Sequence, residues 1–377
     1  MKTFKLLFLV IALNLCALSF AQPSHYIYVS DAGNFNIPTS KVLRYDLDGS
    51  NPQTFISSDF FVANNVGWPQ DILFLEDQGV VLISCLIGNK ITKHNASTGA
   101  YIEDFADVPG GPTRMKIGAD GYIYVLQWSN SINKVLRFQQ DGTPMGEFTD
   151  VGVSQSIGMD WDASGNLYVS SYGGSKVVQF DTAGMSQGDF ITTELSGPTN
   201  IMTEADGNFL VLNWNGGNIK RFDSSGGYIE TFTTDVAQPE GIAIHPVSNN
   251  YIIGNGGPAK IDEFAPDGTL VGTIVESGSG GLMQPNAVVF RDATLAVKDL
   301  MKNKVLVTPT MGSTFKLNNI ETLYLNNLEV ISIVGQKVAT IDLSQEIWDA
   351  SVLKEGMYFL VSNEKGISFF QKIIVKK

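Results

Sequence analysis

Three aromatic residues recur at one position of a repeated pattern, beside polar residues that form hydrogen bonds. Aromatic rings cover the apolar faces of a sugar, lactone or peptide, and amides or a guanidinium meet its polar edges. The predicted ligand-binding residues are Trp128, Tyr172, Trp214, Arg114, Gln127, Asn213 and Asn255. Two alternatives stay open: each ring packs against a neighbouring element, or Arg114 forms a salt bridge at the rim.

The elements that carry these residues belong to a repeat. Successive units start at Pro69, Pro112, Ser156, Pro198 and Pro239, which are 43, 44, 42 and 41 residues apart. Each unit holds short runs of β-branched and aromatic residues separated by polar turns that contain glycine. A period of 40–45 residues with four short strands is typical of one blade of a β-propeller.

The two ends of the repeat region predict how the ring closes. Residues 26–58 contain three strands of a unit but lack the first one, and residues 285–290 form a lone first strand. Placing both in one blade gives a closed ring of six blades, which leaves no exposed sheet edge. The fold class is therefore predicted as all-β, with a six-bladed β-propeller over residues 22–291.

Strand order also predicts where a site lies. In a four-stranded antiparallel blade, the loops between blades and the loops after the second strand lie on the same face. The aromatic positions fall in the loops after the second strand, whereas the regular Asp-Gly and Ser-Gly turns fall on the opposite face. The mouth of the propeller on the first face is thus the predicted ligand site.

The repeat period and strand pattern resemble the six-bladed NHL-type propellers and the broader gluconolactonase-like group, over about residues 24–290. The second resemblance implies a divalent cation held in the mouth by one Glu, two Asn and one Asp. The residues that supply these types here are Asp71, Asn200, Glu240 and Asn286. Oxygen donors of this kind suit Ca²⁺, so calcium is a possible cofactor and a metal-dependent lactonase, hydrolase or lyase is an alternative function.

The C-terminal segment does not continue the repeat. Residues 292–303 are predicted to be a linker, and residues 304–377 a small Ig-like β-sandwich of short alternating strands. This segment resembles the type A C-terminal sorting domain of the type IX (Por) secretion system of Bacteroidetes. The residues that carry the resemblance are Pro309, Gly335, Asp349, Ser351, Leu353, Gly356, Tyr358 and Lys372. The resemblance implies recognition by the type IX machinery at the outer membrane.

The first 21 residues predict passage through the inner membrane. Lys2 and Lys5 precede an apolar run, and the small residues Ser19 and Ala21 mark cleavage before Gln22, which is the pattern of a secretory signal peptide. No later stretch has the length of apolar sequence that a transmembrane helix needs. The predicted location is therefore outside the cell or on its outer surface, reached through the periplasm.

Charge and cysteine content exclude several functions. The net charge of −13 makes binding to nucleic acid unfavourable, because phosphates would be repelled. Cys85 is the one cysteine after the signal peptide, so no intrachain disulfide is expected. None of the three histidines falls on the mouth loops, which argues against a Ser-His-Asp site there. The predicted role is ligand binding, with the metal-dependent enzyme and a scaffold for a surface assembly as alternatives.

Overall fold

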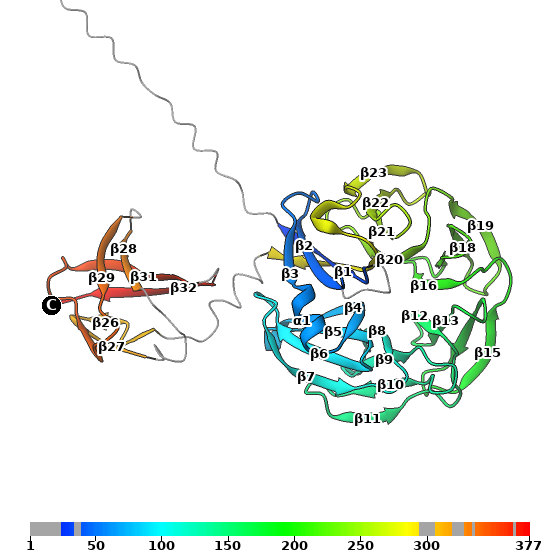
Figure 1. Cartoon of the computed structure of the whole chain (residues 1–377), viewed down its shortest axis with the longest axis horizontal. Coiled ribbons are helices and arrows are strands. Elements are labelled where there is room, and N and C mark those ends of the chain that lie inside the picture. The colour runs from blue at the N-terminus through cyan, green and yellow to red at the C-terminus, as the bar shows by residue number, and fades with distance from the viewer. Residues whose placement is uncertain (1–23, 34–38, 294–305, 319–327, 334–335, 365–366) are drawn as a thin grey trace, which may run out of the picture.

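The structure is a computed structural model that describes residues 24–33, 39–293, 306–318, 328–333, 336–364 and 367–377. In the described part of residues 24–293, six four-stranded antiparallel sheets are arranged in a ring (Figure 1). We number these sheets as blades 1 to 6 in chain order.

Blades 1 to 3 contain the first strands of the chain and one strand from much later in the sequence. Blade 1 comprises β24 (Pro285–Asp292), β1 (His25–Asp31), β2 (Lys41–Asp46) and β3 (Gln53–Ile56). Blade 2 comprises β4 (Gly67–Leu75), β5 (Val80–Ile87), β6 (Lys90–Asn95) and β7 (Tyr101–Asp107). Blade 3 comprises β8 (Pro112–Ile117), β9 (Ile123–Gln127), β10 (Val135–Phe138) and β11 (Pro144–Glu147).

Blades 4 to 6 follow in regular order. Blade 4 comprises β12 (Ser156–Trp161), β13 (Leu167–Ser171), β14 (Lys176–Phe180) and β15 (Ser186–Ile191). Blade 5 comprises β16 (Pro198–Thr203), β17 (Phe209–Asn213), β18 (Asn218–Phe222) and β19 (Tyr228–Thr233). Blade 6 comprises β20 (Pro239–Ile244), β21 (Tyr251–Asn255), β22 (Lys260–Phe264) and β23 (Leu270–Val275).

Burial along each blade follows its place in the ring. The second strands β9, β13, β17 and β21 are buried at every residue, because a neighbouring blade covers each face of the sheet. The last strands lie on the outside, and β11 is exposed at all four residues. Figure 1 shows β12, β16 and β20 toward the centre and β15, β19 and β23 on the rim.

The hydrophobic core is divided into layers between adjacent blades. Between blades 4 and 5, for example, Tyr168 packs against Phe209 with ring centroids 4.6 Å apart, and Phe222 is fully buried beside them. Hydrogen bonds also join neighbouring blades, since Thr113 Oγ1 donates to the carbonyl of Ser156 over 2.9 Å. Blade contacts thus fix the inner strands whose ends surround the mouth.

The strand pairing predicted from the two ends of the repeat is present in blade 1. Strand β24 pairs antiparallel with β1, with Ile27 opposite Phe290 and Val29 opposite Val288. Blade 1 also packs against blade 6, the preceding blade of the ring, through a hydrophobic cluster that includes Leu43 and Ile252. The first and last strands of the propeller are therefore hydrogen-bonded neighbours.

Three short helices interrupt the described strands. They are α1 (Ser58–Ala63), η1 (Glu76–Gln78) and η2 (Ser279–Gly281). Helix α1 connects blade 1 to blade 2 and buries Phe61 fully in the layer between these blades. The sequence does not predict this helix, because one buried aromatic in six residues gives no clear helical period.

The C-terminal region is a separate pair of β-sheets. One sheet has the order β25-β27-β30 and the other β26-β32-β31-β28-β29. Their bounds are β25 (Val307–Thr308), β26 (Met311–Gly312), β27 (Thr314–Leu317), β28 (Leu328–Ser332), β29 (Lys337–Ile341), β30 (Ile347–Asp349), β31 (Gly356–Glu364) and β32 (Ile367–Val375). Phe315, Val330, Leu360 and Ile373 are among its buried core residues. The predicted fold class, a propeller followed by a small β domain, is confirmed.

Candidate functional site at the propeller mouth

A repeated backbone hydrogen bond places three aromatic residues at the mouth. Trp128, Tyr172 and Trp214 each follow the last residue of a second strand, β9, β13 or β17. Their backbone N–H groups donate to the carbonyls of Gly111 (2.9 Å), Gln155 (3.0 Å) and Gly197 (3.0 Å), respectively. Each of these acceptors is the residue just before the inner strand of the same blade. The same loop geometry in three successive blades therefore directs three rings toward one place.

A fourth ring, Trp68, reaches the same place from the beginning of the inner strand β4. Trp68 precedes Pro69 in β4 and has a left-handed backbone, with φ of 50°. The corresponding residues Gly111, Gly197 and Gln238 also have positive φ and also precede a proline. Trp68 was not among the predicted ligand residues, because it lies just before Pro69, where the repeat unit was taken to start. The available signal was a tryptophan at a repeat position that holds Gly or Gln in other blades.

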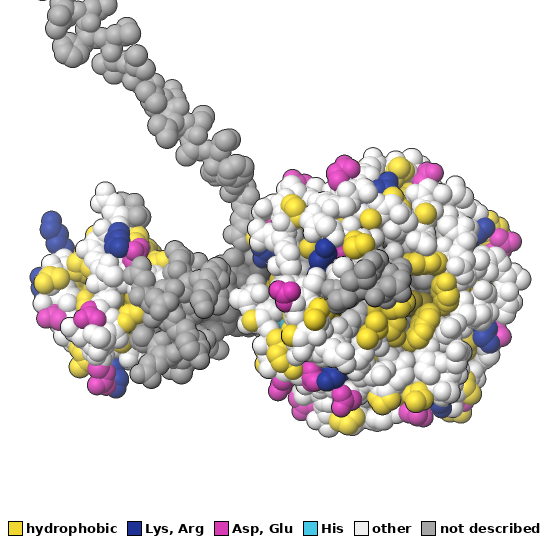
Figure 2. Space-filling model, in the orientation of Figure 1, with side chains coloured by type: hydrophobic (Ala, Val, Ile, Leu, Met, Phe, Trp, Pro, Cys, Tyr) yellow, Lys and Arg dark blue, Asp and Glu magenta, His cyan; other side chains and the backbone are white. Residues whose placement is uncertain are grey.

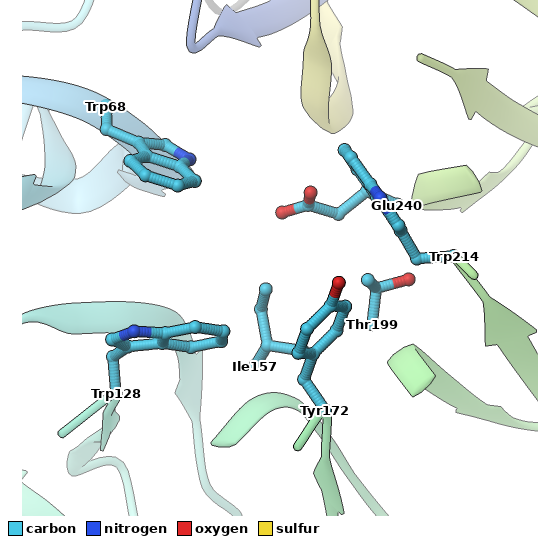
Figure 3. Close-up of a pocket in the computed structure, with 7 residues that line it drawn as sticks. All are labelled: Trp68, Trp128, Ile157, Tyr172, Thr199, Trp214 and Glu240. Carbon is cyan, nitrogen blue, oxygen red and sulfur yellow. The ribbon is translucent and has the colours of Figure 1, made fainter. Parts of the chain in front are cut away.

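The four rings line a pocket of about 200 Å³, completed by Ile157, Thr199 and Glu240 (Figure 3). All four aromatic side chains are half-buried, whereas Ile157, Thr199 and Glu240 are buried. Trp128 and Tyr172 are neighbours in a tilted arrangement, with ring centroids 5.8 Å apart and planes at 45°. Figure 2 shows hydrophobic side chains gathered near the centre of this face of the propeller.

Glu240 forms the acidic floor of the pocket and belongs to an ionic cluster centred on Arg114. Its Nη2 donates to Glu240 Oε1 over 3.3 Å and to the carbonyl of Asn286 over 2.7 Å, and its Nη1 lies 3.8 Å from Asp71 Oδ1. Nη1 also donates to the carbonyl of Gln70. With its amide nitrogen toward Glu240, Gln70 donates to Oε1 over 2.8 Å and accepts from Trp68 Nε1 over 2.5 Å.

Burial dominates the protonation of this cluster. It raises the pKa of Glu240 to about 8; the positive charge of Arg114 opposes this shift and the carboxylate of Asp71 reinforces it. The pKa of Asp71 is also raised by burial, although Arg114 and two backbone N–H groups oppose the shift. Glu240 and Asp71 thus share the single guanidinium of Arg114. Because one positive charge balances only one carboxylate, the pair keeps a proton more readily than free carboxyl groups do in water.

The predicted calcium ligands do not fit a calcium ion in this arrangement. Asp71, Asn200, Glu240 and Asn286 all lie on inner strands around the channel, as expected, but Arg114 supplies the positive charge among them. Both carboxylate oxygens of Asp71 accept backbone N–H groups, and Asn200 Oδ1 accepts the N–H of Ile201. Within the described residues, no three His, Cys, Asp or Glu side chains are grouped to hold a metal.

The predicted polar ligand residues lie behind the pocket wall and not on it. Gln127, Asn213 and Asn255 are at most 3% exposed. Asn213 Oδ1 accepts the N–H of Ser196 over 3.0 Å, and Asn255 Oδ1 accepts that of Ala237 over 2.8 Å. Gln127 donates to the carbonyl of Pro109 and accepts from the N–H of Lys134. Their hydrogen bonds hold the mouth loops, so their contribution to a site is positional.

Gly197 allows Tyr172 to approach the blade 5 loop. A Cβ at this residue would lie 2.9 Å from Tyr172 Cε2 and 2.5 Å from Asn215 Nδ2, and its φ is +60°. We expect Gly197→Ala to reduce the free energy of unfolding by about 2 kcal/mol or more. Gly207→Ala is the matched control, with φ of +88° but its nearest neighbour 3.9 Å away, and should cost about 1 kcal/mol. Equal losses in urea unfolding would contradict the close contact.

The sorting-motif residues stabilise the turn before β31 and its core contacts. Asp349 Oδ1 accepts the N–H of Ser351 over 2.8 Å, and Tyr358 donates its hydroxyl to the carbonyl of Lys354 over 2.9 Å. Leu353 and Tyr358 pack against the hydrophobic core of this domain. Gly356 begins β31, Pro309 follows β25, and Lys372 is an exposed residue of β32. Gly335 lies outside the described residues.

Comparison with known protein families identifies the C-terminal region. Residues 309–376 match the family described as a secretion system C-terminal sorting domain. This part of the chain therefore matches a type IX sorting domain. The finding implies interaction with the type IX secretion machinery and export to the cell surface or beyond. Among the residues that the structure describes, no helix has the length and hydropathy to cross a bilayer.

Solved structures support the fold of the remaining chain. The crystal structure of a nidogen/laminin complex includes a chain with TM-score 0.58 and 12% identity, and the match covers 71% of this chain and 98% of that one. A protein of unknown function from Bacteroides caccae has TM-score 0.56 and 13% identity, with the same coverages. At such identities the likeness establishes the β-propeller fold alone. No curated protein matches the chain.

Proposed function

We propose that this protein is an exported β-propeller that binds a small ligand, or a small group of a larger one, in its mouth pocket. The observation that carries the proposal is the convergence of Trp68, Trp128, Tyr172 and Trp214, from four successive blades, on one pocket. Half-buried aromatic side chains that leave a cavity between them are unusual on a soluble surface and typical of recognition sites. The candidate ligands of this pocket are glycans, peptides and small organic molecules.

The sorting domain supports a place of action outside the cell. We propose that residues 1–21, which lie outside the described residues, are a signal peptide and that the chain comes from a bacterium of the Bacteroidetes type. The propeller of residues 22–291 and the sorting domain of residues 304–377 would then be exported as one chain through the periplasm. Binding outside the cell suits a pocket that opens on the surface of the propeller face.

Intrinsic fluorescence tests the proposal directly, because three of the five tryptophans line the pocket. The chain without residues 1–21 is titrated with panels of oligosaccharides, peptides and small organic molecules. A ligand should change the emission, and Trp128→Ala or Trp214→Ala should weaken its binding by about tenfold or more. Tyr228→Ala, an exposed aromatic on the outer strand β19, is the control and should bind normally.

The result that would contradict the proposal is equally specific. If every ligand found by the screen binds the Trp128→Ala and Trp214→Ala variants as tightly as the parent chain, the pocket is not the site. Thermal unfolding of each variant, recorded alongside, separates a lost contact from a lost fold.

A further inference from the structure

The arrangement of the rings restricts the shape of the ligand. Trp68, Trp128, Tyr172 and Trp214 come from different blades and stand around the cavity as walls (Figure 3). Rings on several sides of a small cavity enclose a compact, roughly spherical group. A single flat platform, which would suit the face of a sugar ring, is not what these four positions form. The cavity of about 200 Å³ accommodates a small group and not an extended chain.

Polar groups in the pocket are few and mostly engaged. Thr199 donates its hydroxyl to the carbonyl of Pro239 over 2.6 Å, and Tyr172 donates its hydroxyl to Asn215 Oδ1 over 3.1 Å. The indole nitrogen of Trp68 is taken by Gln70. A ligand rich in hydroxyls would lose its hydrogen bonds to water and regain few of them here.

The one charged side chain among the described residues that line the pocket is acidic. The carboxyl group of Glu240 points into the cavity between the rings (Figure 3). Beneath it, Arg114 faces both Glu240 and Asp71. With both carboxyl groups ionised, these three side chains carry one negative charge in excess. A cation among the rings would therefore gain from the carboxylate and from the negative faces of the aromatic systems together.

We propose that the pocket binds an alkylated ammonium group of a free small molecule, of the choline type. Such a group is compact, carries a positive charge, and has methyl groups that need no hydrogen-bond partner. Each feature matches one of the three observations: walls of aromatic rings, engaged polar groups, and an acidic floor. This inference rests on the proposed function and names the chemical class of its ligand.

Binding of such a cation is coupled to protons. The charged and titratable groups that face Glu240 are Arg114 on β8 and Asp71 on β4, with the phenol of Tyr172 at the wall of the pocket. Glu240 is protonated below a pKa of about 8 in the free protein, and a bound cation stabilises its ionised form. Affinity should therefore rise by about tenfold or more between pH 6 and pH 9, with release of a proton.

The decisive experiment compares two probes of the same shape. Choline and its uncharged isostere 3,3-dimethylbutan-1-ol are titrated into the chain without residues 1–21 at pH 9 by calorimetry and fluorescence. Choline is expected to bind about tenfold more tightly or better. Equal affinity would overturn the cation assignment while leaving a binding pocket in place. Binding of an oligosaccharide but neither probe would also overturn it, whereas failure of all probes and panels would overturn the proposed function itself.

Variants test the role of the acidic floor. Glu240→Gln keeps an oxygen that can accept from Arg114 but removes the charge. It should lower choline affinity about tenfold at pH 9, remove the rise with pH, and leave the neutral isostere unaffected. Trp214→Ala, which removes one aromatic wall of the pocket, should weaken both probes. An unchanged choline affinity and pH profile in Glu240→Gln would overturn the proposal.

A last comparison distinguishes the source of the ammonium group. Tetramethylammonium, a trimethyllysine peptide and phosphatidylcholine vesicles carry the same chemistry in different contexts. Comparable affinity for choline and tetramethylammonium, with no gain from the peptide or vesicles, supports a free solute. Binding of the peptide or of vesicles at least about tenfold tighter than choline would overturn that assignment in favour of a protein or membrane partner.

Discussion

Deletion of residues 304–377 should leave the propeller inside the outer membrane of a host that has a type IX secretion system. These residues include the whole segment that matches a sorting domain, and their two sheets form a hydrophobic core of their own. A recognition surface built on that core disappears with it, while the six blades keep their contacts. Cell fractionation and protease accessibility should show near-complete loss of the extracellular or surface form, with the propeller retained in the periplasm.

The matched control keeps the sorting domain folded. Val352 is 84% exposed in the turn before β31, so Val352→Ser should be exported normally. In the reverse experiment, residues 304–377 attached to a periplasmic reporter should carry the reporter out of the cell. Export of the truncated chain at the normal level would show that the segment is not the address.

Replacement of Arg114 by alanine should destabilise the propeller by about 3–5 kcal/mol. Its guanidinium is the charged partner of both Glu240 and Asp71 and also binds the carbonyls of Gln70 and Asn286. Without it, two buried carboxyl groups face each other in the channel. Urea unfolding at pH 8 measures the loss. The control is Lys116→Ala on the same strand, whose partly exposed ion pair with Asp160 should be worth about 1 kcal/mol or less.

The pH dependence of this loss has a definite sign. A carboxyl group whose pKa is higher in the folded state binds more protons when folded, so the free energy of unfolding falls as pH rises between the two values. For Glu240 this window extends from 4.5 to about 8, and removal of Arg114 widens it. The destabilisation should therefore be larger at pH 8 than at pH 5. A loss equal to that of Lys116→Ala, or one that grows toward acid, would contradict the buried cluster.

The sequence predicted the fold better than the site because strand patterns and loop geometry carry different information. Mostly apolar second strands such as β17 and the lone strand at 285–290 indicate burial and pairing through the pattern of residue types along the chain. The position of Trp68 depends on its left-handed backbone near the start of β4, and nothing in its residue type indicates that conformation.

The ionic cluster of Arg114 and Glu240 could not be predicted from the sequence for a related reason. Arg114 and Glu240 are 126 residues apart in the sequence and meet only because the ring brings opposite inner strands to one channel. Residue types suggested oxygen ligands for a metal, whereas the folded chain already supplies the cation. Likewise, Asn213 and Asn255 are predicted ligand residues, but their side-chain oxygens accept hydrogen bonds from backbone N–H groups of the loops. Such hydrogen-bond assignments need the positions of both partners.

The pairing of β24 with β1 also sets an order of events during synthesis. The first strand of the propeller leaves the ribosome with one edge unsatisfied, and its partner arrives about 260 residues later, immediately before the linker. Until β24 has been synthesised, blade 1 lacks its inner strand and the ring of blades cannot close. Because the sorting domain follows β24 in the sequence, it is translated only after the last strand that ring closure requires. Chains truncated before residue 285 would therefore lack both the closing strand and the export signal.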